Sequence, residues 1–187
     1  MKCQRLLGKR SRYSARVRGP KREATTVIKS GQVYRLSVSA RKGSKKNNIA
    51  EVLLIENFGI AGDAHAGSER QISLLPYEAF DVIRERLPDI KPGDFAENIT
   101  TRGFDFSTAS VGDRLCVGAG VRLVITQIGK ECHNDCYIRQ AVGDCIMPRQ
   151  GIFASIAEGG PIRVGDTIRW EDDHEHAARP LTGGGKL

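Results

Sequence analysis

Apolar residues in this chain come in short runs separated by glycine and aspartate turns, and this spacing limits the folds it can adopt. Gln32–Ala40 alternates apolar and polar residues with the period of a half-buried strand. Val52–Ile55 and Gln71–Pro76 are short apolar runs typical of buried strands, and Gly159–Trp170 contains the final strand. We therefore predict a mainly β fold, a small β-barrel with one or a few short helices.

Tyr77–Leu87 is the best candidate for a helix. Phe80, Ile83 and Leu87 fall on one helical face, and Pro88 is expected to end the helix. The alternation of apolar and polar residues that marks the predicted strands is missing from this segment.

Two turn signals bear on how the strands connect. Gly118–Gly120 separates two short apolar runs and predicts a hairpin. The tripeptide V-G-D occurs at 111–113 and again at 164–166, each time before a predicted strand. We expect these two turns to be equivalent entrances to strands.

Basic residues concentrate ahead of the predicted domain. Residues 1–30 contain ten Lys or Arg and one Glu, a net charge of +9, and the rest of the chain has 29 − 10 = 19 basic and 22 − 1 = 21 acidic residues, net −2. We predict a basic tail at 1–31, one domain at 32–170 and a polar tail at 171–187. The basic tail is compatible with a solvated extension, a nucleic-acid-binding arm or a transit peptide. Nucleic acid is not expected as a partner of the nearly neutral domain.

No apolar run is long enough to cross a bilayer, and no apolar stretch near the N-terminus suits a secretory signal. We expect a cytoplasmic protein without a membrane partner. A reducing compartment disfavours structural disulfides.

Three of the five cysteines lie in Gly129–Phe153, where Cys132, His133, Cys136 and Cys145 fall within fourteen residues. Together they could form a structural zinc site, although the adjacent positions of Cys132 and His133 suit one ion poorly. A disulfide is less favoured in a reducing compartment.

A reactive thiolate is the third interpretation of this cluster. Lys130, Arg139 and Arg149 place cations near the cysteines in the sequence, and cations favour the thiolate. Packing of the cysteines as small buried side chains is the simplest alternative, and we expect it for Cys116, which lies within a predicted strand.

A glycine-rich loop carries further candidates. Gly59–Gly67 contains Asp63 and His65 among small residues, and Arg70 follows. Such a loop could surround an anionic group with backbone N–H donors, with Arg70 adding charge. Asn98, in Gly93–Thr100, would on its own be an ordinary residue at a strand edge.

Taken in order, six segments resemble the MOSC domain, named for the molybdenum cofactor sulfurase C-terminal domain. They are GIAGDAHAG with RQISLL, PGDFAENITT, VGDRLCVG, TQIGKECHNDCYI, GDCIMPRQGIF and GGPIRVGDTI, within Gln32–Trp170. The sequence is most similar to the small stand-alone bacterial MOSC proteins. The resemblance implies a barrel-like fold and one functional cysteine, which carries sulfur as a persulfide or ligates molybdenum. By its place in the family pattern this cysteine is Cys136.

The resemblance also implies a binding site for molybdenum cofactor (molybdopterin), and pyridoxal phosphate is not expected. Its implied partners are proteins of cofactor biosynthesis or molybdoenzymes that receive the cofactor. In this interpretation the pterin is lined by one group of residues and the cofactor phosphate faces another. The first group is Asp63, His65, Arg70 and Asn98, and the second is Lys130 and Arg149.

Three functions stay open at this point. The leading one is binding, sulfuration or delivery of molybdenum cofactor through Cys136. The second is a small molybdenum-dependent reductase of N-hydroxylated compounds, and the third is a β module whose zinc ligands are Cys132, His133, Cys136 and Cys145. The sequence does not decide whether the protein is an enzyme. If it is one, we expect a molybdenum-dependent oxidoreductase or a sulfur-transfer protein.

Overall fold

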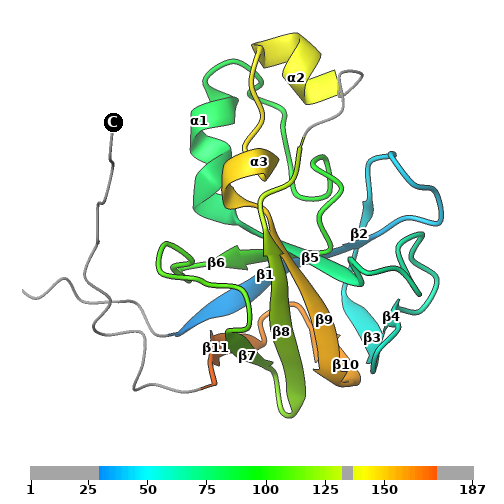
Figure 1. The fold of residues 1–187 in the computed structure, drawn as a ribbon. Helices are drawn as coiled ribbons and strands as arrows, with labels where there is room; N and C mark the ends of the chain where they lie inside the picture. Colours follow the sequence, from blue (N-terminus) through cyan, green and yellow to red (C-terminus); the bar gives the residue numbers. More distant parts are fainter. Residues whose placement is uncertain (1–29, 132–136, 172–187) are drawn as a thin grey trace, which may run out of the picture.

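The computed structural model describes residues 30–131 and 137–171, and these form a closed β-barrel with three short α-helices at one end (Figure 1). Seven strands close the barrel in the order β11-β7-β8-β9-β5-β6-β1, with β1 pairing back onto β11. The barrel strands are β1 (Ser30–Val38), β5 (Ile72–Pro76), β6 (Ile99–Arg102), β7 (Arg114–Val117), β8 (Val121–Ile128), β9 (Ile152–Glu158) and β11 (Thr167–Trp170). The predicted fold class is confirmed.

An odd number of strands cannot alternate in direction all the way around a closed barrel, so at least one neighbouring pair must be parallel. That pair is β5 and β6. Parallel neighbours need a crossover connection, because a tight hairpin can join only antiparallel strands. The crossover runs through residues 77–98 and contains a 3₁₀-helix, η1 (Tyr77–Ala79), and α1 (Phe80–Arg84).

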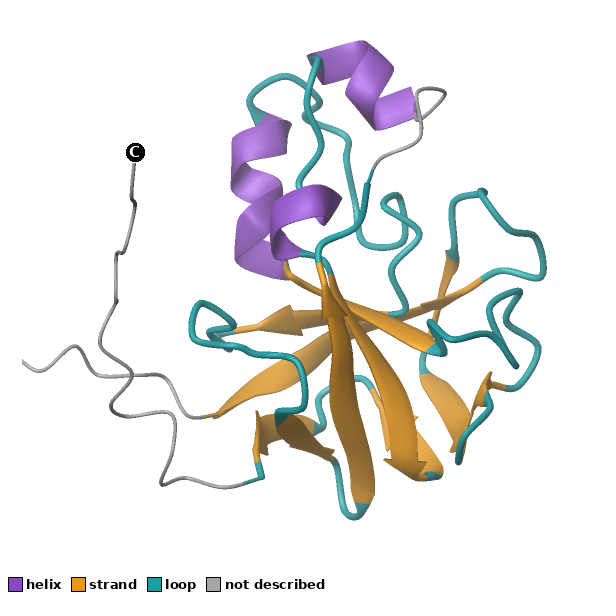
Figure 2. Ribbon diagram, viewed as in Figure 1, coloured by secondary structure: helices purple, strands orange, loops and turns teal. Residues whose placement is uncertain are grey.

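The remaining elements extend the barrel at its sides and at one end. The helices gather above the upper end of the barrel in Figure 2, and a small sheet, ordered β10-β3-β4, lies beside it. These elements are β2 (Asn47–Ile49), which pairs with β1, β3 (Glu51–Ile55), β4 (Gly59–Ile60), β10 (Gly160–Arg163), α2 (Tyr137–Val142) and α3 (Met147–Gln150).

Two apolar clusters stabilise this arrangement. The larger one fills the barrel with aliphatic side chains from every barrel strand and with Trp170, which is 1% exposed. The smaller one joins the helices to the barrel end, with Phe80 packed edge-on against Phe95 and Met147 beside them. Each helix is too short to be stable alone, so burial in this second cluster is what holds the helices in place.

The helix predicted at Tyr77–Leu87 is present but shorter. It begins as a 3₁₀ turn and its α-helical part ends at Arg84, after which the N–H groups of Arg86 and Leu87 both bond to the carbonyl of Ile83. The predicted apolar face is buried at Phe80 and Ile83.

The two V-G-D turns are equivalent, as predicted. Gly112 and Gly165 have φ values of 95° and 96°, which glycine adopts without strain. In each turn the aspartate accepts a backbone N–H from three residues earlier, at 2.7 Å for Asp113 and 2.8 Å for Asp166. The strands that follow, β7 and β11, pair antiparallel.

Within the described ranges, no helix is long and apolar enough to cross a membrane.

Replacing Leu123 by alanine should test the barrel core. Leu123 is fully buried on β8, so Leu123→Ala should lower the free energy of unfolding by about 2–5 kcal/mol. Leu53, which is 53% exposed on β3, provides the matched control, and Leu53→Ala should change it by less than about 1 kcal/mol. Urea denaturation followed by circular dichroism measures both, and equal losses would contradict this description of the core.

Candidate functional site

The glycine-rich loop folds back on itself so that Asp63 points into the protein. Gly62 and Gly67, with φ values of 80° and 73°, allow the tight turns on either side. The six backbone N–H groups from Asp63 to Ser68 all donate hydrogen bonds within the protein. The loop therefore uses these N–H groups to hold its own shape, so a bound anion would have to be held by side chains.

Asp63 is the centre of a buried polar network. Its Oδ2 accepts hydrogen bonds from Lys46 Nζ at 2.6 Å, from Asn98 Nδ2 at 3.1 Å and from the backbone N–H of Ser39 at 3.2 Å. Its Oδ1 accepts the backbone N–H of His65 at 3.0 Å and lies 3.1 Å from His65 Nδ1. The side chains of Lys46 and Asp63 are 1% and 0% exposed, so this ion pair is shielded from water.

The charges of this pair are set by burial and by each other. Burial alone would raise the pKa of Asp63, but hydrogen bonds from His65 and Lys46 outweigh it and hold that pKa well below its ordinary value. Burial lowers the pKa of Lys46, and the Asp63 carboxylate opposes this shift. The network therefore contains the ionised carboxylate of Asp63, which holds Lys46 and His65 in position.

His65 is the partly exposed member of the network, with 30% of its side chain accessible. Asp63 Oδ1 lies 3.1 Å from His65 Nδ1 and, as a carboxylate oxygen, only accepts hydrogen bonds, whereas Lys46 Nζ lies farther away, at 3.5 Å. We therefore assign the Nδ1 proton to the Asp63 contact, which leaves Nε2 as the nitrogen that can exchange a proton with a ligand.

Asn98 connects the network to the barrel. Its Oδ1 accepts hydrogen bonds from the backbone N–H and the hydroxyl of Ser73 on β5, and its Nδ2 donates to the carbonyl of Ser37 on β1 and to Asp63. Asn98 is 1% exposed, so it stabilises Asp63 from within the protein and is not accessible to a ligand.

Glu97 is a second buried acid beside this network. Its Oε1 accepts the N–H of Gly93 at 2.6 Å and the hydroxyl of Thr100 at 2.8 Å, while its buried Oε2 has no hydrogen-bond partner among the described residues. Burial raises the pKa of Glu97 to about 7, against the two hydrogen bonds that lower it. Glu97 is therefore a carboxyl that the fold keeps largely protonated in weakly acidic solution.

A cavity of about 590 Å³ adjoins the Asp63 network at His65 and Ser73, and we call it the cationic cavity. It is lined by Lys42, Gly43, His65, Ser68, Glu69, Arg70, Ser73, Ala96, Lys130, Met147 and Phe153.

Two of the lining cations are held around one ring. Arg70 and Lys130 lie 5.4 and 5.8 Å from the ring centroid of Phe153, and Arg70 Nε donates to Gln127 Oε1 at 2.9 Å. Three basic side chains and His65 face this space against one acid, Glu69. The cavity is suited to an anionic ligand.

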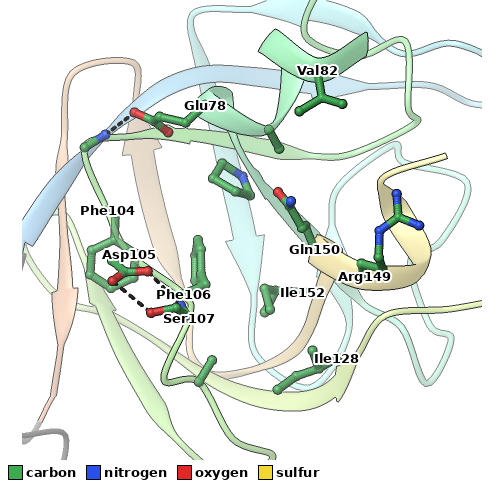
Figure 3. A pocket seen from close by; sticks show the side chains of 14 residues that line it. Glu78, Val82, Phe104, Asp105, Phe106, Ser107, Ile128, Arg149, Gln150 and Ile152 are labelled. Carbon is green, nitrogen blue, oxygen red and sulfur yellow. Dashed lines mark hydrogen bonds between the residues drawn. The ribbon is translucent and has the colours of Figure 1, made fainter. Parts of the chain in front are cut away.

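Arg149 lies elsewhere in the structure. Its guanidinium forms a two-pronged ion pair with Asp144, at 2.6 and 3.2 Å, and both side chains are more than half exposed. Arg149 lines a different cavity, also of about 590 Å³, together with Glu78, Val82 and Gln150 (Figure 3). The structure thus separates Arg149 from the other cofactor residues predicted from the sequence.

The cysteine cluster is only partly described. Cys132, His133 and Cys136 lie outside the described residues, and Cys145 is buried at 4% exposure. In the described part of the chain, no three His, Cys, Asp or Glu side chains gather where they could hold a metal ion. Cys116 is buried, as expected, and its Sγ accepts a hydrogen bond from Arg122 Nη1 at 2.7 Å.

Lys46, the buried partner of Asp63, cannot be identified from the sequence. It belongs to a run of polar and basic residues that has every sign of an exposed loop, and nothing marks one lysine of that run as buried. Lys42 on the cavity wall was missed for the same reason.

The chain belongs to the MOSC domain family: the family model matches residues 61–169. Curated protein sequences gave no match.

Solved structures share the fold. The YuaD protein of Bacillus subtilis is 19% identical, with a TM-score of 0.63 over 74% of this chain and 94% of that one. YiiM of Geobacillus stearothermophilus is 20% identical, with a TM-score of 0.60 over 76% and 75%. YiiM of Escherichia coli is 16% identical, with a TM-score of 0.55 over 75% and 70%.

Breaking the buried ion pair should be costly. Lys46→Met leaves the Asp63 charge buried without its main partner, and we expect the free energy of unfolding to fall by about 3–5 kcal/mol. Lys45 gives a matched control, because it is 59% exposed and pairs with Asp94 near the surface. Lys45→Met should cost at most about 1 kcal/mol in the same denaturation experiment. Similar losses in both variants would contradict the role of the pair.

Glu97 should make stability depend on pH. Its pKa is raised from 4.5 to about 7, so between these values the folded protein keeps a proton that the unfolded chain has lost. This contribution is fully present below pH 4.5 and is lost as the pH rises through 7. Glu97→Gln should therefore flatten the decline in unfolding free energy, which has a limiting slope of about 1.4 kcal/mol per pH unit. Glu51→Gln, at an exposed ion pair, is the control, and a decline unchanged by Glu97→Gln would refute the assignment.

Proposed function

We propose that this MOSC protein binds molybdenum cofactor in the cationic cavity and acts on its metal or its sulfur through Cys136, in cofactor biosynthesis, sulfuration or delivery. The observation that carries the proposal is the cavity itself. Lys42, Arg70 and Lys130 face it together with His65, and Asp63, paired with the buried Lys46, holds that histidine through its Nδ1.

The residues of the cavity fit the cofactor. A space of about 590 Å³ is within the size range of small-molecule sites. A phosphate-bearing ligand needs cationic donors, and an Arg at the wall can bind phosphate through two parallel hydrogen bonds. Because the loop donates its backbone N–H groups internally, Arg70, Lys42 and Lys130 are the cations that would hold the phosphate.

His65 and the network beneath it suit proton handling. With Nδ1–H held by Asp63, Nε2 can accept a proton from a bound ligand or return one. Asn98 and Lys46 keep the Asp63 carboxylate in place while this occurs. The bound cofactor itself would supply a redox-active metal in a sulfur-rich environment.

Cys136 enters the proposal from the family pattern and from its place in the chain. Lys130, on the cavity wall, precedes it by six residues, and α2 begins at Tyr137 directly after it. Thiolate is a suitable ligand for a metal in a sulfur-rich environment.

Cofactor loading tests the proposal. Apo protein is incubated with molybdenum cofactor and gel-filtered, and bound molybdenum and pterin fluorescence are measured on the same sample. Cys136→Ser should lose molybdenum, and Lys130→Ala should weaken retention by roughly tenfold through the loss of one charged contact. Arg163→Ala, at an exposed ion pair with Glu51, lines neither cavity and should match wild type.

Five outcomes test the proposal and separate its alternatives. Equal retention by Cys136→Ser and wild type would contradict the role of Cys136. Turnover of an N-hydroxylated purine by loaded protein with a reduced electron donor would establish the reductase, whereas transfer to an apo-molybdoenzyme without turnover supports delivery. About one zinc ion per chain would favour the structural zinc site. Weaker retention by Arg149→Ala would extend the phosphate site to that residue.

A further inference from the structure

Gln127, on β8, lies behind the wall of the cationic cavity and holds Arg70, which lines it. Arg70 Nε donates a hydrogen bond to Gln127 Oε1 at 2.9 Å, and the guanidinium carbon lies 5.4 Å from the centroid of the Phe153 ring. Gln127 does not line the cavity itself. Because the Nε of Arg70 is bonded, its two Nη groups are the donors that remain for a ligand. Together they form an edge that can bind an oxyanion through two parallel hydrogen bonds.

The other end of the Gln127 amide is bonded as well. Its Nε2 donates to the carbonyl of Gly129 at 2.6 Å. Arg70 Nε only donates and the Gly129 carbonyl only accepts, so the group between them must accept at one end and donate at the other. A side-chain amide does both, whereas a carboxylate cannot donate to the carbonyl and an ammonium cannot accept from the guanidinium. The two partners therefore determine which way the amide of Gln127 faces.

A β-bulge in β8 brings Gln127 to this place. The register with β9 shifts between Ile125, opposite Ala154, and Gln127, opposite Phe153, so that Thr126 is an extra residue. Ile125 is buried in the barrel core, and regular alternation would place residue 127 in the core too. The bulge instead leaves Gln127 half-buried and opposite Phe153, which lines the cavity. Bulges often redirect a side chain in this way.

The carbonyl that orients the amide is fixed by the backbone. Gly129 has a φ of 69°, and its N–H donates to the carbonyl of Gly151 at 2.7 Å. A Cβ at this position would collide with the carbonyl oxygen of Pro148. Glycine is therefore required here, both by its backbone conformation and by the space available. Lys130, another cation of the cavity wall, follows directly.

We propose that Gln127 is a positioning residue, which orients Arg70 so that both of its Nη groups bind the phosphate of the ligand in the cationic cavity. In the described part of the chain no carboxylate pairs with Arg70, so this edge is not neutralised. A guanidinium oriented before the ligand arrives loses less conformational freedom on binding. This proposal rests on the proposed function, since it takes the ligand of the cavity to bear a phosphate, and it adds what fixes the geometry of phosphate binding.

An NMR titration of the full chain with inorganic phosphate, at constant ionic strength and without the cofactor, tests the proposal. The Nε–H resonance of Arg70 is assigned by its loss in Arg70→Ala. Gln127→Leu removes the acceptor, so it should weaken phosphate binding about three- to tenfold and accelerate exchange of this N–H with solvent. Gln150→Leu, the same substitution at an exposed glutamine of α3, should change neither quantity.

A double-mutant cycle separates positioning from a direct effect of Gln127. If Gln127 acts only through Arg70, adding Gln127→Leu to Arg70→Ala should change the phosphate affinity by less than about twofold. Thermal unfolding of each variant confirms that it is folded before affinities are compared. Gln127→Asn, whose shorter amide cannot span both partners, is a second variant and should behave like Gln127→Leu.

Three results would overturn the proposal. They are the absence of phosphate binding by wild type, equal affinity of wild type and Gln127→Leu, and an equal loss from Gln127→Leu with and without Arg70. Failure of the proposed function gives a different result. Molybdenum cofactor would then not be retained, while phosphate would still bind in a way that depends on Gln127, which supports the positioning role with another phosphate-bearing ligand.

Discussion

The carboxylate of Asp63 joins segments of the chain that are far apart in the sequence. It holds Lys46 from 17 residues before it and Asn98 from 35 residues after it, and it fixes the histidine two residues on. A buried charge must be matched by its donors, since removing one partner leaves the other uncompensated. The network therefore fixes the positions of the glycine-rich loop, of the end of the crossover and of His65 in the cavity wall.

The position of the cavity follows from the number of strands in the barrel. Seven strands force at least one parallel pair, and this pair needs a crossover, which contains η1 and α1. The crossover also ends with Glu97 and Asn98 just before β6, next to Ser73 on β5. The buried polar network thus lies beside the parallel pair of β5 and β6.

Much of the fold was readable from the sequence because strands and turns leave local marks. The strand at β1, the hairpin between β7 and β8 and the paired V-G-D turns agree with the predictions from the sequence. Asp63 and His65 were recognised as candidates because small residues surround them, and the structure places them together.

Other features could not be predicted because they depend on long-range contacts. The burial of Lys46 is set by Asp63 and by the barrel end, neither of which marks its own sequence neighbourhood. Arg149 is close to the cysteines in sequence, yet α3 carries it to another cavity, where it pairs with Asp144. In β1 the register with β6 shifts between Val33 and Arg35, and this β-bulge depends on the partner strand as well as on the sequence of β1.

Barrel closure has a consequence for how the chain folds during synthesis. Ser30 pairs with Arg169, a separation of 169 − 30 = 139 residues, so the first barrel strand meets its last neighbour only when almost the whole domain has been made. Until then the edge of β1 that receives β11 presents unpaired backbone groups, which favour mispairing with other chains. A chain that ends before β11 would be left as an open, aggregation-prone sheet. Folding of the complete chain should be slow for its size, because closing the barrel requires contacts between residues far apart in the sequence.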